Sequence, residues 1–74
     1  MSLSAKQKQL KLLGARIKKL REAADVSCNQ LAFEIGTSEK YLRQLEKGEL
    51  NFGVSKLYLL ADALDVDIRD FFEE

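Results

Sequence analysis

Histidine, proline and tryptophan are missing from this chain of 74 residues, and its one cysteine is Cys28. Without histidine and with a single thiol, the chain lacks the nitrogen and sulfur ligands that a zinc site needs. One cysteine also excludes an intrachain disulfide. We therefore expect no metal and no cofactor. A chain this short then depends on a compact helical core or on a second subunit for its stability.

Long apolar runs are missing as well. No stretch approaches the roughly 20 apolar residues of a membrane-spanning helix, and the lysine-rich start lacks the apolar core of a signal peptide. The single thiol fits a reducing compartment, so we expect a cytoplasmic protein with no membrane partner. The sequence has no histidine, no glycine-rich phosphate loop and no nucleophile–base pair at a suitable spacing. We therefore expect neither an enzyme nor a small-molecule ligand.

Charge is balanced in total but divided along the chain. The 12 basic and 12 acidic residues cancel, which by itself argues against nucleic-acid binding. Residues 1–21, however, carry seven basic residues and no acidic one, whereas residues 22–74 carry five basic and 12 acidic residues. A neutral chain with this distribution can present one positive face. The alternative is a solvated helix face followed by an acidic segment.

Apolar residues recur every three or four positions almost throughout, which indicates amphipathic helices. No segment alternates with a period of two for long, so a sheet is not expected. The pattern predicts an all-α fold, a compact bundle of five short helices that forms a single domain over residues 1–74. The predicted helices cover about 4 or 8 to 24, 28–35, 38–46, 54–64 and a short last segment with Ile68, Phe71 and Phe72. Residues 1–7 form a flexible basic segment if the first helix starts at Lys8.

Short polar residues mark several predicted helix boundaries. Asp25 tolerates the left-handed conformation that stops a helix. Ser27 and Gln30 form a capping-box pattern at the start of the second helix. Thr37 is placed to cap the third helix, and Asp67 to cap the last one. Glycines at positions 36 and 48 are expected to end the second and third helices.

The run from Ser27 to Gly48 reads SCNQLAFEIGTSEKYLRQLEKG. It resembles the helix-turn-helix motif of the phage repressor/Cro (XRE-like) family, with Ser, then Leu-Ala, then Gly, and an aliphatic-Glu-x-Gly ending. The segments 14–21 (GARIKKLR) and 59–66 (LLADALDV) resemble the first and fourth helices of that family. The resemblance covers about residues 13–72. It implies a lambda-repressor-like DNA-binding domain with the helix-turn-helix at the second and third helices.

The residues of the motif have physical reasons for their types. A small side chain, Ala32, is needed where the two helices cross closely, and Gly36 supplies the tight turn between them. Gly14 weakens the first helix by about 1 kcal/mol relative to alanine, and we expect a small residue there to permit close packing. The expected core residues of the two helices are Leu31, Ile35, Leu42 and Leu45.

The resemblance implies base contacts from the third helix, whose N-terminal part enters the major groove in such proteins. The matching positions are Glu39, Lys40, Arg43 and Gln44. Lysine or arginine can donate to guanine, glutamine can pair with adenine, and glutamate can accept from cytosine. The alternative is that these residues form an ordinary solvated helix face.

Phosphate contacts are expected from groups that flank the third helix. The candidates are Ser38, Asn29, Gln30, Lys47, Asn51, Arg16 and Lys19. Family members usually carry a phosphate-binding glutamine at the position of Cys28, so Asn29 or Gln30 replaces that contact here. Cys28 is either a tolerated small residue or a redox sensor, because helix N-termini lower the pKa of a thiol. Glu49 stands where the family often has a basic residue.

Two further expectations concern structure and assembly. Arg21 and Glu46 match a pair that in the family forms a salt bridge between the first and third helices, and we expect it to orient the recognition helix. One helix-turn-helix contacts about half of an operator, and the last segment is rich in apolar residues, so we expect a homodimer on a two-fold-symmetric operator. Candidate dimer contacts are Phe52, Tyr58, Val66, Ile68, Phe71 and Phe72; alternatively, Phe71 and Phe72 fold back on their own core.

The function that follows is sequence-specific regulation of transcription through double-stranded DNA. The sequence does not separate a phage-type repressor from a restriction–modification controller. A protein-interaction module that has lost DNA binding is the alternative, favoured by the zero net charge and by Glu39 and Glu49. An antitoxin that binds both DNA and a toxin is a mixed case.

Overall fold

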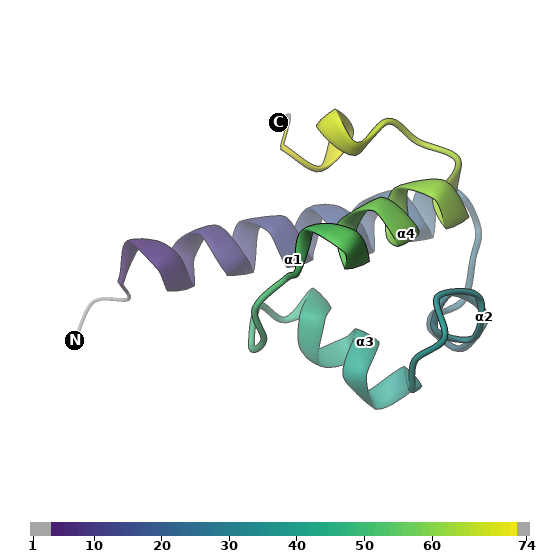
Figure 1. Ribbon diagram of the computed structural model, residues 1–74, viewed down its shortest axis with the longest axis horizontal. Helices are drawn as coiled ribbons and strands as arrows, with labels where there is room; N and C mark the ends of the chain where they lie inside the picture. The colour runs from purple at the N-terminus through teal and green to yellow at the C-terminus, as the bar shows by residue number, and fades with distance from the viewer. Residues whose placement is uncertain (1–3, 73–74) are drawn as a thin grey trace.

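The computed structural model describes residues 4–72, and within that range it is helical with short connections and no strand. Its elements are α1 (Ala5–Ala23), α2 (Cys28–Glu34), α3 (Glu39–Glu46), α4 (Val54–Leu64) and one turn of 3-10 helix, η1 (Ile68–Phe71). α3 packs on one side of α1 and η1 on the other, while α2 contacts both α3 and α4 (Figure 1). The outer half of α1 extends beyond the other elements. The predicted all-α class is therefore confirmed.

Serine side chains start the first three helices. The Ser4 hydroxyl accepts from the Gln7 N–H at 3.1 Å, and the Gln7 side chain accepts from the Ser4 N–H at 3.0 Å. This complete capping box fixes the earlier of the two predicted starts for α1. Residues 4–7 are therefore ordered rather than a flexible segment, and residues 1–3 lie outside the described residues.

The third helix begins one residue later than expected. Ser38, and not Thr37, is its N-cap, because the Ser38 hydroxyl accepts from the Tyr41 N–H at 3.0 Å. At α2 the Ser27 hydroxyl accepts from the Gln30 N–H at 3.0 Å, which is the first half of the predicted capping box. Either hydroxyl satisfies one of the N–H groups that every helix start leaves without an intrahelical partner.

Left-handed residues end the helices where the sequence suggested. Asp25 and Gly36 have φ values of 59° and 72°.

The predicted fifth helix is only a turn of 3-10 helix, closed by a capping box between Asp67 and Asp70. A segment of four residues is too short to complete α-helical hydrogen bonding, and the tighter 3-10 form suits such short pieces.

Every α-helix contributes at least one side chain to a single core. The completely buried side chains are Ile17, Leu31, Leu42, Leu45 and Leu60. Burying each of them contributes roughly 1.5–3 kcal/mol relative to an exposed position. Phe71 of η1, which is 3% exposed, closes the core on the far side of α1 from α3. The four core residues expected for the motif, which include Ile35, are all buried.

α1 and α3 are in close contact at Gly14. A β-carbon at this position would lie 2.6 Å from the Glu46 carbonyl oxygen and even nearer to that of Leu45. Glycine is therefore required by the contact with a neighbouring backbone, and the cost in helix propensity is the price of that contact. The close packing expected from the sequence is present.

Arg21 and Glu46 form a buried ion pair between α1 and α3. The Arg21 Nε donates to Glu46 Oε2 at 2.7 Å, and Nη2 donates to Oε1 at 3.3 Å. The remaining Nη1 donates to the Val26 carbonyl at 2.9 Å, in the turn between α1 and α2. The hydrogen bonds with Glu46 raise the pKa of Arg21, so the guanidinium stays charged although it is largely buried. One side chain thus holds three segments together.

Replacing Gly14 by alanine tests the close approach. Helix propensity alone would stabilise the variant by about 1 kcal/mol, but the new methyl group meets backbone atoms that cannot move aside. We expect a net loss of about 1–2 kcal/mol, in the range of overpacked cores. Urea unfolding followed by circular dichroism measures it, and Ala15→Gly, at the exposed neighbouring position, calibrates the propensity difference. A more stable Gly14→Ala protein would contradict the contact.

Replacing Arg21 by methionine tests the ion pair. The variant leaves the Glu46 carboxylate buried without its partner, so we expect a loss of about 3–5 kcal/mol in the free energy of unfolding. The double variant Arg21→Met/Glu46→Leu removes both charges and should recover most of that loss. An Arg21→Met protein that unfolds at the parent urea concentration would show that the pair does not support α3.

Candidate nucleic-acid interface

The helix-turn-helix unit is built from α2, the turn at Gly36 and α3. The turn is closed by a backbone hydrogen bond of 2.9 Å from the Thr37 N–H to the Ala32 carbonyl. Ala32 is 2% exposed, as expected for the residue at the crossing of two helices. Leu31 and Leu42 fill the space between the helices, so α3 has a fixed position relative to α2.

One face of α3 is left free by this packing. Leu42, Leu45 and Glu46 are buried against the rest of the domain. Lys40 and Arg43 are exposed and Gln44 is half-buried, and at 100° per residue they fall on the opposite side of the helix together with Lys47. The outer face of the helix therefore carries three cations and one amide.

Glu39 differs from the other predicted base-contacting residues, because its carboxylate is already occupied. It forms an ion pair with Arg43 one turn later in α3. Its Oε1 also accepts from Asn29 Nδ2 of α2 at 3.2 Å. Glu39 thus joins the start of α2 to α3 and holds two candidate DNA-binding side chains in place.

Cys28 packs between the two helices of the motif. Its thiol donates to the Glu39 carbonyl oxygen with a sulfur–oxygen distance of 3.8 Å, and the side chain is half-buried. Burial raises the pKa of the Cys28 thiol. The redox-sensor hypothesis calls for a lowered thiol pKa, because the thiolate is the reactive form. The Cys28 side chain, which is smaller than the glutamine usual at this position, fits the contact between α2 and α3.

The structure adds one basic residue that sequence reasoning did not select, Lys18. A shallow hollow of about 260 Å³ beside α3 is lined by Lys18, Arg43 and Lys47 together with the buried Arg21–Glu46 pair and Cys28. Lys18 lies one turn after Gly14 and shares its side of α1. Lys18 could have been selected from the sequence, because Gly14 and Arg21 mark the stripe of α1 that meets α3.

Arg16 and Lys19 lie on another side of α1 from this interface. The Arg16 Nε donates to the Asp70 carbonyl of η1 at 3.0 Å. Both residues line a groove between α1 and the segment around Phe72, on the side of α1 away from α3. The other predicted phosphate-contacting residues, Ser38, Asn29, Gln30, Lys47 and Asn51, are exposed in α2, at the start or end of α3, or in the following loop.

The candidate dimer contacts divide into three groups. Phe71 is buried in its own core and is not exposed for a dimer contact. Phe52, Val66 and Ile68 are partly buried against that core. Tyr58 and Phe72 remain exposed, at 58% and 65%. The alternative that the two phenylalanines fold back therefore holds for the first of them only.

Comparison with known proteins agrees with this geometry. A helix-turn-helix family profile matches residues 17–71. Uncharacterized HTH-type transcriptional regulators of Rickettsia conorii and Rickettsia prowazekii are each 39% identical over 67 residues, 90% of this chain. Those alignments cover 54% and 52% of the relatives, so the chain spans about half the length of these curated proteins.

Solved structures share the whole fold. The restriction-modification controller protein C.AhdI of Aeromonas hydrophila is 34% identical with a TM-score of 0.84, over 88% of this chain and 98% of the other. The clp gene regulator ClgR of Corynebacterium glutamicum is 26% identical with the same TM-score, over 86% and 83%. The motif geometry, the family profile and these relatives lead to one conclusion: the chain belongs to the helix-turn-helix family of the repressor/Cro (XRE-like) type.

Proposed function

We propose that this chain binds double-stranded DNA at specific sequences and regulates transcription, with α3 in the major groove. The observation that carries the proposal is the free face of α3, where Lys40, Arg43, Gln44 and Lys47 project from a helix whose other face is locked in the core. A major groove about 12 Å wide admits such a helix. The similarity to C.AhdI supports a regulator of the restriction–modification controller type.

The proposed base-contacting residues are Lys40, Arg43 and Gln44. Gln44 can pair with adenine through two hydrogen bonds, and Lys40 or Arg43 can donate to guanine. Arg43 must first leave the carboxylate of Glu39. The pair is partly exposed, and separating such a surface pair costs only about 0.2–1 kcal/mol. We therefore assign Glu39 to positioning Arg43 and Asn29, and not to reading cytosine.

Phosphate contacts fall to the groups around this face. Lys18 and Lys47 flank the hollow beside α3 and supply positive charge next to the phosphates at the edge of the DNA major groove. Ser38 accepts from the Tyr41 N–H, and its hydroxyl hydrogen remains available to a phosphate oxygen. Asn29, Gln30 and Asn51 complete the set as neutral donors. Together these contacts make binding sensitive to salt, because each cation displaces counterions from the DNA.

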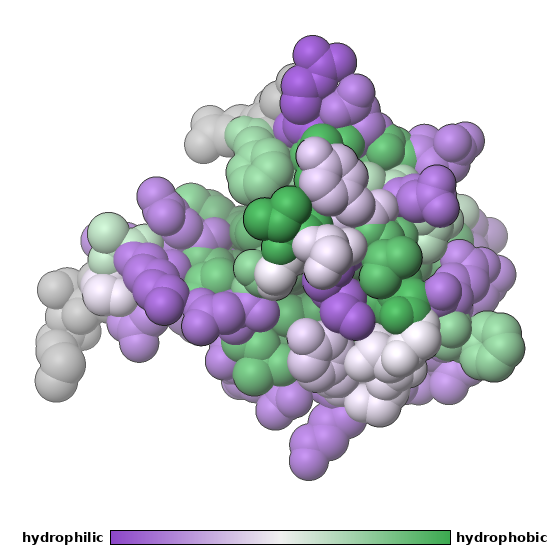
Figure 2. Space-filling model, viewed as in Figure 1, coloured by the Kyte–Doolittle hydropathy of each residue, from purple (hydrophilic) through white to green (hydrophobic). Residues whose placement is uncertain are grey.

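The two-fold partner is proposed to pack on the outer face of α4. Val54, Tyr58 and Leu59 are 67%, 58% and 47% exposed and lie on one side of that helix. In Figure 2 apolar side chains lie among polar ones over the region where α4 faces the viewer. A two-fold contact here leaves both α3 helices uncovered for half-sites about 34–36 Å apart. The proposed setting is the cytoplasm, where the free thiol of Cys28 stays reduced.

Neighbouring lysines provide the test of DNA binding. Selection from a random duplex library, at about 50 and about 200 mM salt, should enrich a two-fold-symmetric motif that weakens sharply at the higher salt. On that motif Lys18→Ala should weaken binding to all sequences alike and lower the salt slope by about 1. Lys19→Ala removes the same charge from the part of α1 that lines the other groove and should leave the affinity unchanged.

The same assay distinguishes base contacts from phosphate contacts. Gln44→Ala should relax the preference at one position by about 1–3 kcal/mol, whereas Lys47→Ala should weaken every sequence equally. If no motif is enriched at either salt concentration, the proposal fails and the fold serves protein interaction instead. If Lys18→Ala and Lys19→Ala behave alike, the orientation of α1 on DNA is wrong.

The dimer is tested by Tyr58→Glu, which places a charge in the proposed contact. We expect the variant to sediment as a monomer at tens of micromolar in about 0.5 M salt, where an apolar contact persists in the parent. Its affinity for the symmetric motif should fall while its affinity for a half-site is kept. Phe33→Ser, which removes an exposed aromatic from α2, is the matched control and should remain dimeric. A parent protein that is monomeric with and without DNA would overturn this contact.

A further inference from the structure

An apolar groove with a basic rim runs along the outer half of α1. It has a volume of about 850 Å³ and lies between α1, Phe52 and the end of η1. Leu12 and Phe72, which are 69% and 65% exposed, form part of its walls. The charged residues that line it, including Lys6 and Lys19, are all basic. Apolar surface of this kind, rimmed by polar groups, is a frequent mark of an interaction site.

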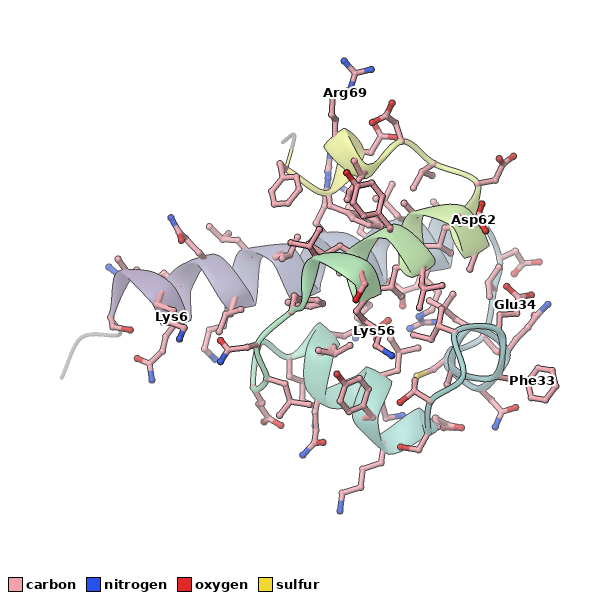
Figure 3. All side chains as sticks on the ribbon, viewed as in Figure 1. Lys6, Phe33, Glu34, Lys56, Asp62 and Arg69 are labelled. Atoms are coloured by element: carbon pink, nitrogen blue, oxygen red, sulfur yellow. The ribbon has the colours of Figure 1, made fainter. Side chains whose placement is uncertain are left out.

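The opposite end of the molecule carries a protruding aromatic side chain with acidic neighbours. Phe33 of α2 is 85% exposed, more than any other large hydrophobic residue in the described range, and points away from the body (Figure 3). Glu34 lies beside it and Asp62 on the same end. Residues 22–38 and 57–68, which supply most of this end, contain six acidic residues and neither lysine nor arginine.

The two ends are complementary to each other but not to themselves. Two grooves face to face would bring the cations around Lys6 and Lys19 together, and two Phe33 ends would bring acidic residues together, which repels in both cases. Phe33 against the groove instead joins an apolar side chain to an apolar surface and acids to bases. Burial of one aromatic ring together with screened ion pairs is typical of a weak, specific contact.

From these two surfaces we infer that copies of this chain associate end to end, with Phe33 of one copy seated in the groove beside Leu12 and Phe72 of the next. The contact is heterologous, so it leaves a free groove at one end and a free Phe33 at the other and permits further growth. It uses neither the outer face of α3 nor that of α4, and is thus additional to the proposed two-fold dimer. The molecule is 36 Å long, close to the roughly 34 Å of one DNA turn.

Complementary variants test this contact. Phe33→Ser removes the protruding side chain, and Leu12→Glu places an acid at the wall of the groove; both positions are exposed, and circular dichroism checks that both variants fold. Sedimentation velocity of the parent at about 0.05 M salt should show species larger than the basal monomer or dimer, increasing with concentration. Each variant alone should lose them, with association weakened roughly tenfold or more. Ala5→Glu, outside the groove on the same helix, controls for the added charge.

An equal mixture of the Phe33→Ser and Leu12→Glu proteins gives the decisive result. It should regain larger species, because one variant keeps the groove and the other keeps Phe33. About 0.5 M salt should lower their proportion, because it screens the ion pairs of the contact. If the Phe33→Ser protein still assembles, or if the mixture stays at the basal size, the end-to-end contact is wrong. Neither outcome depends on DNA binding, since the outer face of α3 is intact in both variants.

Discussion

The junction between α1 and α3 is the contact on which the rest of this domain depends. At Gly14 the two backbones touch, and about two turns further along α1, Arg21 spans the junction to Glu46 and to the turn before α2. A helix of eight residues such as α3 is too short to be stable alone. Its position is therefore set by what lies behind it, and the direction of its outer side chains is a property of this junction more than of α3 itself.

The charge distribution explains how a neutral chain remains suited to an anionic partner. The cations of α1 do not form one patch, because a helix packed on two sides distributes them. Lys18 turns toward α3, while Arg16 turns toward η1, where it anchors a backbone carbonyl. Glu34 and Asp62 lie at the end formed by α2 and by the C-terminal part of α4, away from the outer face of α3, whereas Glu39 lies at the tip of α3. Net charge is for this reason a poor guide to the potential at any one face.

Local patterns in the sequence were sufficient to predict a residue's role wherever the conformation or the close approach of the backbone requires that residue type. Asp25 and Gly36 adopt positive φ, and Gly14 occupies a position where only glycine fits. The family resemblance added the Arg21–Glu46 pair, which no periodicity reveals. Periodicity identifies a buried stripe but not the element that covers it. It does not show that the Arg16 side chain bonds to η1. The burial of Phe71 likewise depends on a chain reversal near Asp65 that brings η1 back onto α1.

The contact of Glu39 with Arg43 and Asn29 has a consequence for discrimination among sequences. The protein carries its own anion at the tip of α3. In the binding mode proposed above, this carboxylate competes with DNA for both donors. A duplex that offers only phosphates gains little by displacing one anion with another. A duplex whose base edges present two well-placed acceptors replaces the hydrogen bonds that the two donors lose when they leave Glu39. An internal competitor of this kind lowers background occupancy along random DNA more than it lowers occupancy of the right site, so selectivity is gained at the expense of raw affinity.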